Sequence, residues 1–298
     1  MKKLLVIIPI VVVVLSACRK RLDNFLFNPD TSITEYLMDD YTGPGELTLG
    51  ASYVIPDSLV HKFTFESTDE GKTETIHAIY IGDLSKISTD TVILYCHGNA
   101  GHMDYYWARQ KLIAHAGGKN HFGVLQLDYP GYGLSTGAPT ESNMYASVGH
   151  AIDWLKSKGL SNDKFYMYGF SLGSAPVCKI TAAKTYALTP SKIVIESPFA
   201  SAEVMVQDAA GLNMPGSYFV NLKIDNAEQI KNIDQPLLWI HGTDDDFLSI
   251  VTHGEVFYKN YKGAYGEALR VEGGNHPDVP AVFGYTNYLL TLTKFLQK

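Results

Sequence analysis

The nine residues YMYGFSLGS at positions 166–174 run from a short apolar segment into a Gly-x-Ser-x-Gly turn. The pattern predicts a strand that leads directly into a helix, with Ser171 at the turn between them. Gly169 and Gly173 are needed there because a side chain at either position would clash with the turn or with the helix. Such a turn exposes the serine hydroxyl at the tip of the strand. We therefore predict that Ser171 is a nucleophile.

This motif alone does not establish catalysis. Small residues around a serine are also common where a strand packs tightly onto the helix that follows it, and that is the alternative interpretation. The hypothesis depends on whether the chain also supplies a base, an acid and donors for an oxyanion.

The rest of the chain alternates short apolar strands with helical segments. Strands are predicted at 59–66, 75–81, 91–96, 122–127, 164–168, 192–195, 236–240 and 268–271, and helices at 105–116, 142–158, 171–185, 251–261 and 285–296. This alternation indicates the α/β class, with a mostly parallel sheet flanked by helices. Residues 200–234, which include Tyr218 and Phe219, form a connection of unusual length. We expect a small helical cap there, the alternative being an ordinary crossover with an extra turn.

Four loops after predicted strands carry unusual residues. They read HGNAG at 97–101, DYPGYGLS at 128–135, HGTDDD at 241–246 and GGNH at 273–276. Because ligands bind at the carboxyl ends of strands in open α/β sheets, we expect these loops to surround a site.

Together with the serine turn, these motifs resemble in their order the α/β-hydrolase superfamily, and most closely its Bem46-like serine-hydrolase branch. The resemblance runs from about residue 59 to the C-terminus and implies the α/β-hydrolase fold. It also implies that Ser171 is the nucleophile, Asp245 the acid and His276 the base, in the chain order usual for this fold. A serine hydroxyl is inert until an imidazole takes its proton, and a carboxylate then orients that imidazole.

Several positions in the same motifs leave alternatives open. Asp244 and Asp246 compete with Asp245 for the role of acid. The resemblance places His97 and His241 at structural positions, and the other histidines are expected at the surface or in the core.

The resemblance also assigns the oxyanion donors, which are the backbone N–H groups of Asn99 and Leu172. Pro130 stands where this branch usually has arginine, which puts a local ion pair at that turn in doubt.

Composition sets limits on the function. The chain has 298 residues and a formal net charge of −7, and its one basic run lies beside the N-terminal apolar segment, so no nucleic-acid partner is expected. Three cysteines without a Cys-x-x-Cys pair suggest neither a disulfide framework nor a zinc site, and Cys96 and Cys178 are expected to be buried. We expect no metal and no cofactor.

The N-terminus resembles a bacterial lipoprotein signal peptide. Two lysines precede an apolar run at 4–15, which is too short to span a bilayer, and LSAC at 15–18 fits the lipobox. The resemblance implies lipidation of Cys18 and attachment to a membrane of the cell envelope. An ordinary signal peptide or an uncleaved anchor is the alternative. We expect residues 1–18 to be the signal, 19–50 a tether whose aromatics partly pack on the domain, and 51–298 the hydrolase domain.

The predicted function is a serine hydrolase that cleaves an ester, thioester or amide of a small-molecule or acyl substrate through an acyl-enzyme. A serine peptidase of the same fold is one alternative. The other is a catalytically silent binding lipoprotein, since fold does not dictate function.

Overall fold

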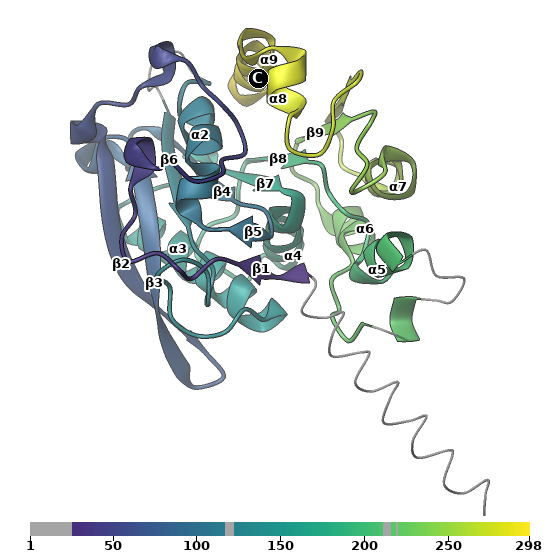
Figure 1. The fold of residues 1–298 in the computed structure, drawn as a ribbon, viewed down its shortest axis with the longest axis horizontal. Coiled ribbons are helices and arrows are strands. Elements are labelled where there is room, and N and C mark those ends of the chain that lie inside the picture. Colours follow the sequence, from purple (N-terminus) through teal and green to yellow (C-terminus); the bar gives the residue numbers. More distant parts are fainter. Residues whose placement is uncertain (1–25, 117–121, 211–215, 219) are drawn as a thin grey trace, which may run out of the picture.

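The computed structural model describes residues 26–116, 122–210, 216–218 and 220–298. Its centre is an eight-stranded sheet (Figure 1), in the order β10-β9-β8-β7-β4-β6-β3-β2. All neighbouring strands are parallel except at β3, which is antiparallel to both of its neighbours. The strands are β2 (Val60–Asp69), β3 (Lys72–Ile81), β4 (Thr91–Cys96), β6 (Phe122–Leu127), β7 (Phe165–Phe170), β8 (Lys192–Glu196), β9 (Leu237–Gly242) and β10 (Gly266–Val271). The predicted mostly parallel sheet is confirmed.

Helices cover both faces of the sheet and bury its alternating side chains. In β4, Ile93 and Tyr95 enter one core cluster, whereas Val92, Leu94 and Cys96 enter the other, as a period of two requires. The first cluster includes residues of α2 (Met103–Ala114), α8 (Val279–Phe283) and α9 (Tyr285–Gln297). The second includes residues of α3 (Glu141–Ser157), α4 (Ser174–Ala183), α5 (Ala202–Ala210) and α7 (Glu255–Asn260), and the short helix α6 (Asn226–Gln229) lies between two of its members, Ile224 and Ile230. Cys96 and Cys178 are buried free thiols.

The β2–β3 hairpin is longer than the sequence suggests. Residues 67–73 were expected to connect two strands, but the ladder continues through Ser67 opposite Glu74 to Asp69 opposite Lys72. The turn itself is only Glu70 and Gly71, both with positive φ. Polar residues fit this end of the hairpin because much of it is exposed, so polarity alone did not mark the turn. Helix α8 was not predicted, since five residues carry too short a pattern.

The N-terminal extension packs onto the domain from its first described residue. Strand β1 (Asn28–Pro29) pairs in parallel with β5 (Ala100–Gly101) in a separate two-stranded sheet, and Figure 1 shows the two side by side. Phe27 and Tyr36 are buried, and the Tyr36 hydroxyl donates to Asp128 at 2.7 Å. Cys18 and the predicted signal lie outside the described residues. No helix within the described ranges is long and apolar enough to cross a membrane.

Candidate active site

The serine turn has the strained geometry that its sequence predicts. Ser171 lies between β7 and α4 with a φ of +51°, in the left-handed region that side chains rarely occupy. A Cβ atom at Gly169 would lie 2.6 Å from the carbonyl oxygen of Gly173, and one at Gly173 would lie 1.9 Å from that of Cys96. Only glycine fits at these two positions, and the turn therefore holds the hydroxyl in one place.

The structure brings three distant side chains into one hydrogen-bonded line. The Ser171 Oγ lies 2.9 Å from His276 Nε2, and His276 Nδ1 lies 2.8 Å from Asp245 Oδ2. Asp245 and His276 come from the loops after β9 and β10, so parallel strands deliver them to the same edge. The carboxylate fixes the tautomer in which Nδ1 donates, which leaves Nε2 free to accept the serine proton. Asp244 and Asp246 are exposed, whereas Asp245 is buried.

Asp245 is held as a carboxylate by several donors. Burial by itself would raise its pKa, but hydrogen bonds from His241 and His276 and the backbone N–H of Leu248 keep the pKa well below its usual range. The Leu248 N–H donates to Oδ1 at 2.7 Å, and His241 Nε2 lies 3.2 Å from Oδ2. The resemblance placed His241 at a structural position, and the structure shows that it contacts the predicted acid directly.

His97 lies in the core below the site. Its ring stacks between Tyr106 and Tyr129 with centroids 4.8 and 4.3 Å away, and its Nε2 lies 3.3 Å from Asp128. These contacts hold the ring in the core, and His97 lines neither of the cavities that border Ser171.

The predicted oxyanion residues, Asn99 and Leu172, both lie beside the cavity that Ser171 lines. Asn99 and Leu172 line a cavity of about 10 Å³ together with Ser171, and Asn99 also borders a second cavity of about 70 Å³ that includes His276. The carbonyl oxygen of Asn99 accepts two hydrogen bonds of 2.9 Å, from the Asn28 N–H and the Tyr132 hydroxyl. The loop that carries one predicted donor is therefore fixed from two sides.

A buried ionic network behind the base was not predicted. Arg109 on α2 is fully buried between Glu46 of the extension and Glu196 at the end of β8. Its Nη2 also donates to the carbonyl oxygen of Pro277 at 2.9 Å, one residue beyond His276. Burial raises the pKa of Glu46. An arginine on a helix and a glutamate in a polar extension give no local signal that they will meet.

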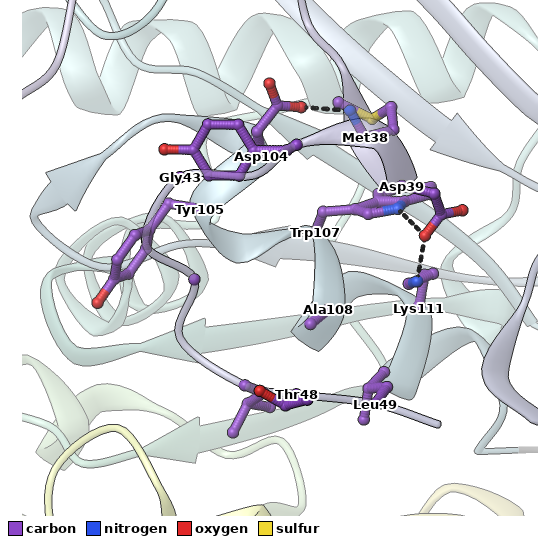
Figure 2. Close-up of a pocket in the computed structure, with 13 residues that line it drawn as sticks. Met38, Asp39, Gly43, Thr48, Leu49, Asp104, Tyr105, Trp107, Ala108 and Lys111 are labelled. Atoms are coloured by element: carbon purple, nitrogen blue, oxygen red, sulfur yellow. Dashed lines mark hydrogen bonds and ion pairs between the residues drawn. The ribbon is translucent and has the colours of Figure 1, made fainter. Parts of the chain in front are cut away.

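A larger cavity, of about 380 Å³, lies between the extension and α2 and is lined by no member of the serine, histidine and aspartate set (Figure 2). Asp39 accepts hydrogen bonds there from Trp107 Nε1 at 3.0 Å and from Lys111. Within the described residues, no group of three or more histidine, cysteine or acidic side chains is arranged to hold a metal ion.

Comparisons with known proteins agree with this architecture. The alpha/beta hydrolase fold family matches residues 91–208. The chain is 28% identical over 214 residues to the alpha/beta hydrolase domain-containing protein 17C of Mus musculus, covering 70% of this chain and 60% of that protein. It is 30% identical over 208 residues to the domain-containing protein aho-3 of Caenorhabditis elegans, covering 68% and 57%. The chain is thus a distant homologue of these proteins and spans about three fifths of their length.

Solved structures show the same fold. An esterase of Pyrococcus furiosus superposes with a TM-score of 0.64 at 17% identity, covering 91% of this chain and 97% of the esterase. The ferulic-acid-bound Est1E of Butyrivibrio proteoclasticus gives 0.59 at 17% identity, covering 78% and 98%. The predicted α/β-hydrolase fold is confirmed.

Proposed function

We propose that the chain is a serine hydrolase that cleaves an ester, thioester or amide through an acyl-enzyme. The observation that carries this proposal is the bridge made by His276, whose two ring nitrogens lie 2.9 Å from Ser171 Oγ and 2.8 Å from Asp245 Oδ2. Esterases among the structural neighbours and the distant hydrolase homologues support the same class.

Each group has one task in the proposed reaction. Ser171 Oγ attacks the substrate carbonyl carbon while His276 Nε2 takes the serine proton, and Asp245 stabilises the resulting imidazolium. The backbone N–H groups of Asn99 and Leu172 stabilise the oxyanion, a contribution of about 10²–10³ in rate per donor. The intermediate collapses, the C–O, C–S or C–N bond breaks, and His276 returns the proton to the leaving group. Water activated by the same imidazole then releases the acid and restores the serine.

Labelling and turnover test this proposal together. The unmodified chain should react with a serine-directed fluorophosphonate and hydrolyse a short p-nitrophenyl ester. The Ser171→Ala variant should do neither while it keeps its far-UV circular dichroism spectrum. Labelling that persists in Ser171→Ala would place the nucleophile elsewhere.

The two alternatives predict different results in the same assay. A peptidase would also cleave short peptide anilides, and the ratio of anilide to ester turnover separates it from an esterase. A silent binding lipoprotein would take neither the label nor the ester. The complete Ser171, Asp245 and His276 arrangement favours an active enzyme.

We further propose that lipid on Cys18 holds the protein on a membrane of the cell envelope. Several acyl chains on one residue anchor stably, because each buried methylene contributes about 0.8 kcal/mol. Metabolic labelling with an alkyne fatty acid in a bacterial host should tag the chain, and Cys18→Ser should remove both the tag and the membrane fraction. A tagged Cys18→Ser protein would refute this assignment.

A further inference from the structure

Leu26, the first residue that the structure describes, lines the cavity beside the predicted nucleophile Ser171. Leu26 is only 1% exposed and borders the cavity of about 10 Å³ that Ser171 also lines. The remaining residues that line this cavity are mostly apolar, namely Asn99, Leu172, Phe199, Met205 and Phe247. A segment that was expected to be a tether therefore supplies part of the reaction site.

Strand β1 fixes the position of Leu26. The Asn28 N–H donates to the Asn99 carbonyl oxygen at 2.9 Å, and the Asp30 N–H donates to that of Gly101 at 3.0 Å. The Asp30 carbonyl oxygen in turn accepts a 3.0 Å hydrogen bond from Gly133. Leu26 is two residues from this ladder, so its side chain is positioned by the same loop that carries a predicted oxyanion donor.

The chemistry assigns a substrate group to each side of Ser171. The leaving group must receive its proton from His276, so it lies on the imidazole side, where His276 lines the cavity of about 70 Å³. The acyl group then extends away from His276, and the apolar cavity that Leu26 lines borders Ser171 without His276 among its lining residues. A cavity of about 10 Å³ holds roughly one water molecule.

We propose that Leu26 is a specificity-determining residue that closes the acyl side of the site and restricts the enzyme to short acyl groups. This inference rests on the proposed serine-hydrolase function and names the substrate feature that the enzyme selects. A longer acyl chain has to displace Leu26 from its buried position.

A series of p-nitrophenyl esters from acetate to octanoate, given to the full-length chain, tests the role of Leu26. Leu26→Ala should raise the ratio of kcat/KM for hexanoate over acetate by about 15-fold. The substitution frees space for roughly two methylenes, each worth about fourfold when buried. Leu26→Trp should lower the same ratio. The matched control is Leu47→Ala, a half-buried leucine of the same extension that lines the separate 380 Å³ cavity, and it should leave the ratio unchanged.

The outcomes separate this inference from the proposed function. An unchanged ratio in both Leu26 variants, with ester turnover retained, overturns the inference and leaves the serine hydrolase intact. A wild-type chain that neither turns over any ester nor takes the fluorophosphonate overturns the proposed function and this inference with it. If Leu26→Ala does not fold, Leu26→Val removes one carbon and should raise the ratio by roughly fourfold. An unchanged ratio there also counts against the proposal.

Discussion

Removing Arg109 should destabilise the protein far more than removing an arginine at the surface. The guanidinium is fully buried, and its Nε and Nη1 donate to Glu46 at 2.9 Å and to Glu196 at 2.7 Å, carboxylates that are themselves buried. It also lies 4.2 Å above the ring of Phe170. In Arg109→Met, two buried carboxyl groups lose their cation, and breaking a buried pair in this way costs about 3–5 kcal/mol. That is a large part of the roughly 5–15 kcal/mol that stabilises a typical domain.

The matched control for this prediction is Arg270→Met. Arg270 pairs with Glu255 and lies 4.8 Å above Trp239, so it makes the same kinds of contact as Arg109, but its side chain is 43% exposed. Exposed pairs contribute about 0–1 kcal/mol. Urea unfolding followed by circular dichroism measures both variants. An Arg109→Met loss below about 1 kcal/mol, or one equal to that of Arg270→Met, would refute the argument from buried charge.

Three further predictions concern the site and its surroundings. Gly173→Ala should abolish ester turnover even where the protein folds, because the new Cβ would lie 1.9 Å from the Cys96 carbonyl oxygen; wild-type kcat in that variant would contradict this. Asp245→Asn should lower kcat by about 10⁴, as loss of the orienting carboxylate does in other triads, and initial rates measure this. Because folding lowers the pKa of Asp245, its carboxylate stabilises the folded protein above the unfolded-state pKa, and this stabilisation is lost as the pH falls. Asp245→Asn should remove that pH dependence from the free energy of unfolding. Burial lowers the pKa of His253 to about 4, so folding favours its neutral form. The free energy of unfolding should therefore fall by up to about 3 kcal/mol as the pH drops from about 6.5 to 4. His253→Gln should reduce this pH dependence in urea unfolding experiments, and an unchanged pH dependence would argue against the prediction.

The sequence predicted the parts of the fold that local pattern controls. Residues 91–96 and 122–127 form strands with the predicted bounds, because a short, nearly continuous apolar run is typical of a strand that is buried on both faces of a parallel sheet. The loops around Asp245 and His276 were also recognisable, since glycines and polar residues mark the ends of strands. These loops converge because parallel strands end at one edge.

The contributions of the extension could not be predicted in the same way. Leu26 and Glu46 act through contacts with residues more than 60 positions away, and no local period records such contacts. Glu46 also looks like an ordinary solvated acid until Arg109 is placed beside it. Burial of such charges depends on the assembled tertiary structure, which a single sequence does not display.

The docking of β1 against the loop that carries Asn99 has a consequence for where the enzyme works. If Cys18 carries lipid, the eight peptide steps from Cys18 to Leu26 span at most about 28 Å when fully extended. Leu26 lies beside Ser171, so a lipid anchor on Cys18 would keep the Ser171 hydroxyl close to the lipid headgroups. Ser171 would then reach esters that are exposed at the membrane surface, whereas a substrate in another compartment would be out of its reach.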